Sequence, residues 1–432
     1  MKVGSKAGFW NVFGIIFVAL ILRLLLATVA HHGDLNNNIS WGQIALESGL
    51  NGFYGSSNAD DWPYSAPNQP PLYILLFAVV TFAWSILHKV IWFLNNNIGF
   101  FPSTLVWFWE ERGISFLAKT PSILADIGIG VLMYRYLKEK FEAKSARFAL
   151  LIWLINPAAW YNSSIWGQTD PIVNFLGLWA ITSLLKSSLV GFAALFSLSV
   201  LFKSSLLIFV PILLPLIYIK KFSKKTVAKS LLVVVLTVFA ISLWFHPYLD
   251  HPLWLFNLYS QRILPGEIGY LTANAFNIWW LVDPGNTYDS QSYFGIPAQF
   301  WGLLLASASI FYIVWQLTVK KFSDKKLLFA LSLSAFSAFL LLTRMHERYL
   351  YPFFVYATLF VAYSRHYLPI YILLSVSHLL NLYNLFWVPG FPFLKRTLEA
   401  TSLPWILSVL NIALFGASMR FYQKDQKPSS IK

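Results

Sequence analysis

Long apolar runs separated by short charged clusters limit what this chain can fold into. A helix that spans a membrane needs roughly 20 mostly apolar residues. Runs of this kind occur at 9–30, 119–137, 148–165, 171–186, 229–245, 296–317, 327–343, 350–364, 368–387 and 402–419. Soluble cores stop growing at about 250–300 residues, yet 57% of these 432 residues are hydrophobic and only 12% are charged. The excess apolar surface must face lipid, so the sequence predicts an all-α, polytopic transmembrane helix bundle of about ten to fourteen helices.

Two regions depart from this simple pattern. The run 187–219 is too long for one span and has Lys203 near its middle, so we expect two short helices that meet at Lys203. Segments 71–94 and 98–118 are apolar enough to cross, but their many aromatic residues also suit helices that lie flat in the interface. Either both cross or neither does, which leaves the side of every later loop unchanged. We expect a long first outer loop, 31–118, that contains interfacial helices.

Lys and Arg residues distinguish the two sides of the bundle. They gather in short segments between the apolar runs, whereas the long polar segments with most of the acidic residues fall on the other side. Because cytoplasmic loops carry the Lys and Arg excess, we expect both termini in the cytoplasm and the elaborated loops on the outer face. The net charge of +14 then reflects topology and does not indicate a nucleic-acid partner. We expect a membrane domain over 1–419 and a cytoplasmic basic tail over 420–432.

The run 9–30 follows Lys2 and Lys6, so a simple alternative is that it is the apolar part of a signal peptide that is cleaved off. The apolar region of a signal peptide is usually about 7–15 residues long. This run is longer and many further runs follow it, so we interpret it as a retained first helix.

The first polar candidates stand in the long outer loop. Asp34 follows His31-His32-Gly33 where the first helix meets water, so its carboxylate is partly desolvated and could serve as a general base. The simple alternative is an interfacial acid that ends a helix. Gln69 is a second polar candidate and precedes Pro70-Pro71, a pair that favours the start of a helix. The simple alternative is that this segment only begins a helix.

A second polar segment, 156–170, crosses an outer helix end. It gathers amides, hydroxyls and a carboxylate, among them Trp166, Gln168 and Asp170. This density of hydrogen-bonding groups suits a sugar or a phosphate at the membrane boundary. The alternative is a capped turn with Asp170 as the helix N-cap.

Basic residues also stand at outer helix ends, against the inside bias. Lys119, Lys203 and Arg344 could each extend to lipid phosphates, or together they could bind the phosphate of a lipid carrier. The densest cluster is 344–352, where two Arg residues accompany His346 and Glu347. Arg suits phosphate oxygens through its planar fork of donors, and His346 or Glu347 could orient an Arg or relay a proton.

A metal site is left open by the sequence. His31, His32, Asp34 and Asp170 could meet in space, but no fixed ligand spacing marks them. The chain has no Cys, which excludes disulfides and thiolate–metal chemistry.

The order of these segments resembles a known superfamily. Asp34 after the first helix, Pro-Pro-Leu-Tyr, Lys-Thr-Pro-Ser-Ile-Leu-Ala-Asp, Asn-Pro before Ser-Ser-Ile-Trp-Gly-Gln-Thr-Asp, Phe-Lys-Ser, Asn-Ala-Phe-Asn-Ile-Trp-Trp and Arg-Met-His-Glu-Arg-Tyr-Leu-Tyr-Pro follow one another. Over residues 10–365 this set resembles the GT-C superfamily of polytopic glycosyltransferases, and within it the prokaryotic relatives of the GPI-anchor mannosyltransferases. The segments 368–387 and 402–419 carry no such signature.

The resemblance implies a reaction and its partners. A hexose, with mannose favoured, would pass from a polyprenyl-phosphate carrier to a glycan, lipid or protein acceptor on the outer face, with membrane lipids around the protein and with inversion at the sugar. A divalent metal, Mg or Mn, could take part, held by Asp34 and Asp170.

The resemblance also implies roles for the candidate residues. Asp34 would deprotonate the acceptor hydroxyl and Asp170 would orient the acceptor or a metal. The donor phosphate would lie near Arg344, His346, Arg348 and Lys203. Further substrate contacts are expected from Gln168, Trp166, Glu347, Lys119 and Gln69.

Two rival functions have their own expected signs. A transporter or flippase of lipid-linked sugars should show ionisable residues near the middle of the bilayer. Nearly all charged residues of this chain lie at predicted helix ends, and Arg23 and Asp126 are the exceptions. A glycan polymerase or ligase would share the outer Arg residues.

Overall fold

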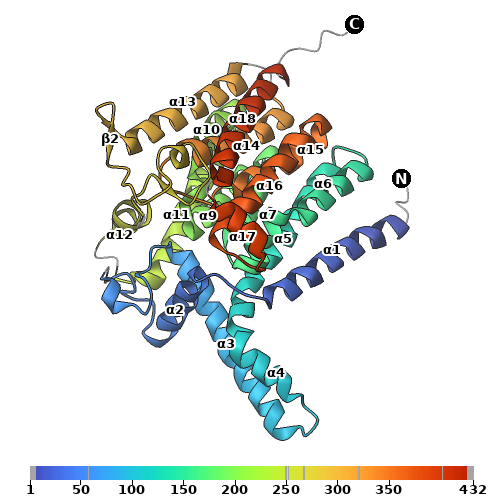
Figure 1. Ribbon diagram of the computed structural model, residues 1–432, viewed down its shortest axis with the longest axis vertical. Coiled ribbons are helices and arrows are strands. Elements are labelled where there is room, and N and C mark those ends of the chain that lie inside the picture. The colour runs from blue at the N-terminus through green and yellow to red at the C-terminus, as the bar shows by residue number, and fades with distance from the viewer. Residues whose placement is uncertain are drawn as a thin grey trace. The chain divides into compact units, whose positions relative to one another are not determined.

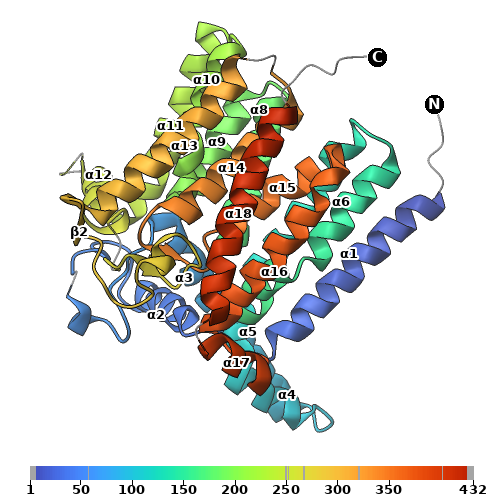
Figure 2. The ribbon, with the colours of Figure 1, turned by 45° about the horizontal axis from the view of Figure 1, so that its top comes forward.

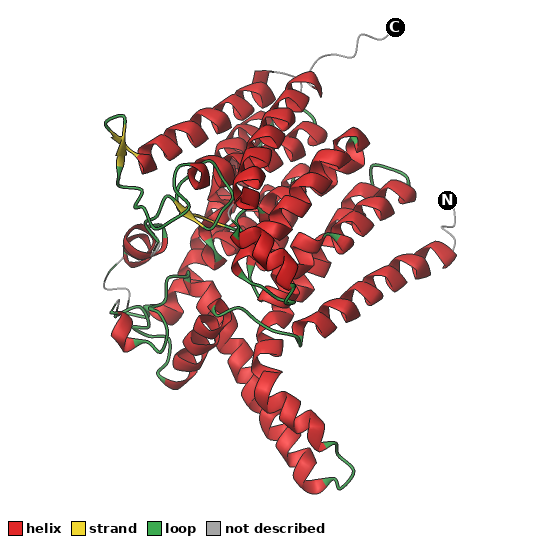
Figure 3. Cartoon of the chain, in the orientation of Figure 1, coloured by secondary structure: helices red, strands yellow, loops and turns green. Residues whose placement is uncertain are grey.

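The computed structural model describes residues 6–56, 58–248, 251, 253–265, 268–319, 322–400 and 402–425. Helices dominate these residues, and the strands are two residues long (Figure 3). The chain divides into two compact units, which are described one by one below. The first unit takes in Met1–Gly128, Ser163–Ser205 and Ser223–Gly266, and the second takes in Ile129–Asn162, Leu206–Phe222 and Glu267–Lys432.

The first unit contains the segment 31–118 and helices that precede and follow it in the sequence. Its helices are α1 (Lys6–Ala27), α2 (Asp34–Glu47), α3 (Pro71–Asn97), α4 (Ser103–Phe108), α8 (Asp170–Leu185), α9 (Leu189–Phe202), α11 (Lys224–Phe245), α12 (Trp254–Leu258) and the first half of α5 (Ile114–Lys138). The short helix α2 packs along α3, and α9 packs between α8 and α11 (Figures 1 and 2). Apolar side chains on α11 are largely exposed, with Leu231 at 61% and Val235 at 60%, which suits a helix that faces lipid.

The second unit surrounds a fully buried helix. Its helices are α6 (Ala143–Ile155), α7 (Pro157–Trp160), α10 (Val210–Ile219), α13 (Ala298–Val319), α14 (Asp324–Leu341), α15 (Tyr351–Tyr363), α16 (Leu368–Leu385), α17 (Pro392–Glu399), α18 (Ser402–Asp425) and the second half of α5. The central helix is α14, which α13, α15 and α18 contact (Figure 2). It is lined by small and apolar residues and buried from Leu327 to Leu340, so it forms the core of this unit.

Short strands join the outer segments of the second unit. Strand β1 (Thr272–Ala273) pairs in parallel with β4 (Met345–His346), and β2 (Ser292–Tyr293) pairs in antiparallel with β3 (Ile296–Pro297). The β1–β4 pair attaches the Asn-Ala-Phe-Asn-Ile-Trp-Trp segment to the Arg-rich segment that begins at Arg344.

The predicted class, an all-α bundle of membrane-spanning helices, is confirmed. Six helical runs are long and apolar enough to cross a bilayer: Pro71–Asn97, Ser103–Lys138, Lys224–Phe245, Ala298–Val319, Arg365–Leu385 and Ser402–Lys424. Five shorter apolar helices accompany them among the described residues. One boundary was predicted wrongly, because 98–118 and 119–137 were expected as separate segments. A π-helical turn, Trp109–Gly113, instead continues α4 into α5 and keeps the helix unbroken.

The predicted break at Lys203 is confirmed, and an additional break was missed. Helix α9 ends at Phe202 and Lys203 is extended, with φ −161° and ψ 134°. The single span expected over 148–165 is wrong, because α6 ends at Ile155. Pro157 disfavours helical backbone at the residue before it, and the Asn156 side chain accepts a hydrogen bond from the Ala158 N–H at 3.0 Å.

The chain ends lie partly outside the described residues. Helix α18 continues to Asp425, so the predicted tail 420–432 begins as helix and its residues 426–432 lie outside the described part. The cytoplasmic location of both termini stays a prediction, as does the division into 1–419 and 420–432.

Candidate functional site

Asp34 occupies the first turn of α2 and meets the second polar segment. The Gln168 side-chain amide donates to Asp34 Oδ2 at 2.6 Å, across 134 positions of sequence. The Asp34 side chain is 40% exposed. The structure therefore brings together two sequence candidates and leaves the carboxylate reachable from water, while a neutral donor orients it.

His32 fixes the segment that leads into Asp34. Its backbone N–H donates to the Trp166 carbonyl at 3.0 Å, and its ring lies 4.7 Å from the ring of Trp166. The His32 Nδ1 atom is 3.2 Å from both the Asp34 amide nitrogen and Asp34 Oδ1. A neutral imidazole can accept from the amide, and a protonated one can donate to the carboxylate. Trp166 is fully buried, so its ring supports the His32 ring from inside the unit.

Gly167 is required by the tight path between Trp166 and Gln168. Its φ is +90°, a region that side chains rarely adopt, and an added Cβ would lie 3.2 Å from Lys119 Cγ. The absence of a side chain therefore lets the chain turn Gln168 toward Asp34.

Asp170 opens α8 and forms a buried ion pair. Lys203 Nζ donates to Asp170 Oδ1 at 2.8 Å, with the side chains 11% and 4% exposed. Among the described residues, Asp170 Oδ2, Thr169 Oγ1 and Asn174 Oδ1 are buried oxygens without a hydrogen-bond partner. The alternative that Asp170 is a helix N-cap is wrong, because Thr169 takes that position and no side chain caps the helix.

Lys119 lies inside the first unit and not at a helix end. Its ammonium donates to the carbonyls of Ala27 at 3.0 Å, Ser164 at 2.9 Å and Ile165 at 3.2 Å, and also contacts the Ala30 carbonyl. The residue is fully buried. These bonds tie the end of α1 to the turn before Trp166, which is a structural role. The predicted contact of Lys119 with substrate stays a prediction.

Gln69 stands just before α3. Its side chain donates to Asn68 Oδ1 at 3.1 Å, and its carbonyl accepts from the Tyr54 hydroxyl at 2.6 Å. This geometry suits the simple alternative of a helix start, and the predicted substrate contact of Gln69 stays a prediction.

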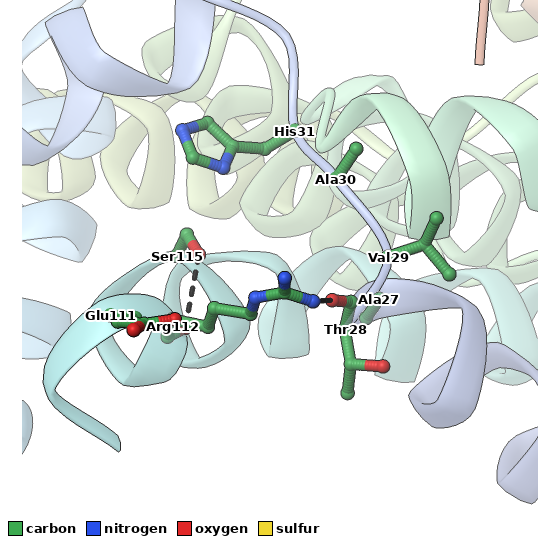
Figure 4. Close-up of a pocket in the computed structure, with 8 residues that line it drawn as sticks. All are labelled: Ala27, Thr28, Val29, Ala30, His31, Glu111, Arg112 and Ser115. Carbon is green, nitrogen blue, oxygen red and sulfur yellow. Dashed lines mark hydrogen bonds between the residues drawn. The ribbon is translucent and has the colours of Figure 1, made fainter. Parts of the chain in front are cut away.

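A pocket of about 340 Å³ lies beside the segment that carries His31 (Figure 4). The lining residues come from the end of α1, the segment after it, the π-helical turn and the start of α5: Ala27, Thr28, Val29, Ala30, His31, Glu111, Arg112 and Ser115. Arg112 donates to the Thr28 carbonyl at 2.7 Å, so its guanidinium crosses the pocket (Figure 4). Burial lowers the pKa of His31 below its ordinary value of 6.5. Glu111 and Arg112 were not among the predicted site residues, because they lie within the mostly apolar segment 98–118.

Arg344, in the second unit, is held by an acid that sequence reasoning missed. Its Nε and Nη2 atoms donate to Asp289 Oδ2 at 2.7 Å and Oδ1 at 3.0 Å, a bidentate pair. Asp289 also accepts from the Thr343 hydroxyl at 2.8 Å and is 1% exposed. This hydrogen bond raises the pKa of Arg344 above its ordinary value. The Arg344 side chain is 36% exposed, so solvent reaches part of it.

The remaining members of the Arg-rich segment form a compact cluster. Arg348 donates to Glu347 Oε1 at 2.8 Å and lies 3.3 Å from His346 Nδ1. Glu347 is fully buried, and the Arg348 side chain is 13% exposed. The guanidinium lies 5.5 Å from the Tyr349 ring centre. The buried carboxylate thus aims Arg348, and His346 stands next to it on β4.

The described residues do not fit the metal site that the sequence left open. No group of three or more His, Asp or Glu side chains in the described part of the chain could hold a metal ion. Asp34 pairs with Gln168 and Asp170 pairs with Lys203, so each carboxylate already has a side-chain donor. We therefore derive no step through a metal.

The two ionisable residues that suggested transport pair with each other. Arg23 Nε donates to Asp126 Oδ2 at 2.7 Å, and the Ser163 hydroxyl donates to the same oxygen at 3.0 Å. Both charged side chains are at most 3% exposed. Such a pair satisfies the charges inside an apolar bundle, which gives Arg23 and Asp126 a structural explanation within the first unit.

No family model matches this sequence, and no curated protein matches it. Among solved structures, the chain is similar to the crystal structure of ArnT from Cupriavidus metallidurans bound to undecaprenyl phosphate. The two chains are 13% identical with a TM-score of 0.47, and the alignment covers 96% of this chain and 78% of that chain.

Proposed function

We propose that this protein is a membrane glycosyltransferase of the GT-C type. It moves a hexose, with mannose favoured, from a polyprenyl-phosphate carrier to a glycan-, lipid- or protein-linked acceptor on the non-cytoplasmic face. The observation that carries the proposal is the Asp34 carboxylate, 40% exposed and oriented by Gln168 at the junction of a helix and the outer loop. The order of motifs from Asp34 to Pro352 supports the same reaction.

Asp34 acts as the general base. It takes the proton of the acceptor hydroxyl as the oxygen attacks the anomeric carbon of the donor sugar. A new glycosidic C–O bond forms, the bond between the anomeric carbon and the carrier phosphate breaks, and both electrons of that bond leave with the phosphate. Attack opposite the leaving group inverts the sugar. Gln168 holds the carboxylate so that one oxygen faces the acceptor.

Asp170 and its neighbours orient the acceptor in this proposal. Asp170 Oδ2 and Thr169 Oγ1 are buried without partners in the described part of the chain, so they can accept hydrogen bonds from sugar hydroxyls. Lys203 neutralises Asp170 at 2.8 Å, which makes the buried carboxylate tolerable before substrate binds.

The Arg-rich cluster of the second unit stabilises the leaving phosphate. Charge grows on the phosphate oxygens as the sugar leaves, and fixed cations that point at those oxygens lower the barrier. Arg348 is aimed by Glu347, and Arg344 is aimed by Asp289. His346 lies between them on β4 and supplies a further donor. Lys203 is an additional donor toward the phosphate once substrate contacts Asp170.

The decisive experiment uses purified protein in lipid vesicles with radiolabelled polyprenyl-phosphate mannose and, separately, polyprenyl-phosphate glucose. A membrane extract supplies acceptors. The proposal expects label to leave one carrier and appear in a water-soluble or lipid-linked glycan, and expects the Asp34→Asn protein to leave both carriers intact. Label that moves across the vesicle membrane while it stays on its carrier would instead identify a flippase.

A further inference from the structure

The segment 274–280 in the second unit is attached to the strand that carries His346. Thr272 pairs with Met345 and Ala273 pairs with His346 in the parallel β1–β4 register. Asn274, at φ +66°, adds an antiparallel bridge to His346. The position of His346 therefore depends on where the backbone of 272–274 is held.

A side-chain amide on α16 holds that backbone. Asn381 Nδ2 donates to the Asn274 carbonyl at 2.6 Å, and Asn381 Oδ1 accepts from the Phe276 N–H at 3.0 Å. Asn381 is 1% exposed. One amide thus satisfies a backbone acceptor and a backbone donor, the pattern by which a strand neighbour would hold an extended segment.

A second amide, on α18, holds the next peptide group. Asn411 Nδ2 donates to the Phe276 carbonyl at 2.8 Å, and Asn411 Oδ1 accepts from the Ser377 hydroxyl of α16 at 2.8 Å. Asn411 is 2% exposed. The hydroxyl from α16 fixes the amide on α18, so the two helices act together on Phe276.

The segment is also fixed at its far side by its own Asn277. This side chain donates to the carbonyls of Phe339 at 3.3 Å and Leu342 at 3.4 Å, and its Oδ1 accepts from the Trp279 N–H at 3.0 Å. The chain continues from Leu342 into Arg344, so the same segment contacts the approach to the Arg-rich cluster. Helix α14 therefore supports the segment after Phe276, and the amides from α16 and α18 support Asn274 and Phe276.

We propose that Asn381 and Asn411 are positioning residues for the phosphate-binding cluster. They hold 274–280, and through the β1–β4 pair they hold His346 and the backbone that leads to Arg348. This inference rests on the proposed function, and it gives α16 and α18 a part in donor binding although their sequences carry no motif. A purely structural role is the competing explanation, because any buried backbone group without a partner destabilises a protein.

The test replaces each amide by an apolar side chain of similar size, Asn381→Leu and Asn411→Leu. The matched control is Ser408→Ala on α18, a fully buried hydroxyl that donates to the Pro404 carbonyl of its own helix. Asn381→Ser is a milder variant, since it buries no charge and leaves space in which water can partner the two backbone groups. Steady-state kinetics separate the donor KM, the acceptor KM and kcat, and thermal unfolding reports stability.

A second readout does not depend on activity. Because the chain has no Cys, the double variant Thr272→Cys/Met345→Cys places a single cysteine pair across β1 and β4. The rate of disulfide formation under a mild oxidant reports how closely the two strands are held. The rate is measured in the cysteine-pair protein with no other change, and again after each of Asn381, Asn411 and Ser408 is replaced in turn.

The proposal expects the donor KM to rise about tenfold in each Asn→Leu variant, as the loss of a buried hydrogen bond implies. In the same variants the acceptor KM and kcat should stay within about twofold of the native values, and disulfide formation should slow at least about threefold. The Ser408→Ala control should leave the two KM values, kcat and the rate of disulfide formation unchanged. If Asn→Leu proteins do not fold, Asn381→Ser should show the same split with a smaller donor effect.

Two results would overturn the proposal. Disulfide formation at the native rate in the Asn381 variants would show that the amide does not hold β1 on β4. Slower disulfide formation with an unchanged donor KM would show that the amides are structural only. If the native protein consumes no lipid-linked sugar, the proposed function fails and the positioning role fails with it, whereas the cysteine pair still decides the anchoring of β1.

Discussion

The candidate residues of the two units differ in which charged group is exposed. In the second unit, the carboxylates of Asp289 and Glu347 are buried, and the guanidiniums of Arg344 and Arg348 that they orient are the more exposed partners. In the first unit, Asp170 and Lys203 follow the same pattern. Asp34 differs, because its carboxylate is 40% exposed and its side-chain neighbours are the amide of Gln168 and the ring of His32. The difference is that Asp34 is an accessible carboxylate, whereas Arg344 and Arg348 are cations held by buried acids; in the proposed reaction the first is the base and the others meet the donor phosphate.

Asp34→Asn should produce the largest change on the side of the base. A positioned general base contributes about 10²–10⁴ to rate, so sugar transfer should fall by about that factor while the protein inserts and unfolds as the native chain does. The measurement is the initial rate of label loss from the sugar carrier. Asp60→Asn, an exposed acid of the same outer loop, is the control and should be fully active. Native activity in the Asp34→Asn protein would show that Asp34 is not the general base.

Lys203→Ala tests the buried ion pair of the first unit. It leaves the Asp170 carboxylate, at 4% exposure, without its cation, which costs about 3–5 kcal/mol in a buried pair. The free energy of unfolding should fall by that amount. The double variant Lys203→Met/Asp170→Asn should recover most of it, since no charge stays buried. Equal instability of the two variants would contradict the ion-pair explanation.

Arg344→Ala tests the cationic side and should act on binding and stability together. The donor KM should rise about tenfold or more, because a charged hydrogen bond contributes about 1.5–3 kcal/mol, and the acceptor KM should stay unchanged. Stability should fall as well, since Asp289 is buried beneath the guanidinium. The stability loss should shrink in Arg344→Ala/Asp289→Asn, whereas the rise in donor KM should persist. An unchanged donor KM in the single variant would show that Arg344 only supports the loop.

His31 should show the smallest effect, and only in acid. Burial lowers its pKa from 6.5, so the unfolded chain binds a proton at this residue more readily than the native protein does. This contribution to stability is therefore present above about pH 6.5 and is lost as the pH falls through and below that value. His31→Gln should flatten the loss of stability below pH 6.5 and leave stability at pH 8 unchanged. An unaltered acid profile would contradict the burial of this ring.

Some of the site could be predicted from the sequence because its signals are local. A lysine in the middle of an overlong apolar run predicts the break that the structure has at Lys203. A carboxylate after a first apolar run, and an amide in a loop between two later runs, identified Asp34 and Gln168 as candidates. Their hydrogen bond joins positions 134 apart, so periodicity could not reveal it.

Other parts depend on partners that leave no mark in a single sequence. Lys119 donates to backbone carbonyls, which every residue carries, so its structural role could not be read from residue types. Asp289 stands in a long outer loop with no motif around it, and only the fold brings it to Arg344. Asn381 and Asn411 lie in apolar helices where an amide looks like a minor interruption. The break before Pro157 did have a local signal, because a proline disfavours helical backbone at the residue before it even within an apolar run.

The central claim is that the base of the first unit and the cations of the second unit face the same aqueous compartment. Single cysteines can test this directly, because the chain has none of its own. Gly33→Cys, where an added Cβ meets nothing within 4 Å, stands beside Asp34, and the exposed Ser290→Cys stands beside Asp289. Ala143→Cys, an exposed position in a Lys-rich segment, marks the opposite side.

The decisive measurement is labelling of these variants in intact cells with a maleimide that does not cross membranes. Our account predicts that Gly33→Cys and Ser290→Cys react from outside and that Ala143→Cys reacts only after the cells are opened. Labelling of Gly33→Cys and Ser290→Cys from opposite sides would separate the base from the cations and contradict the account.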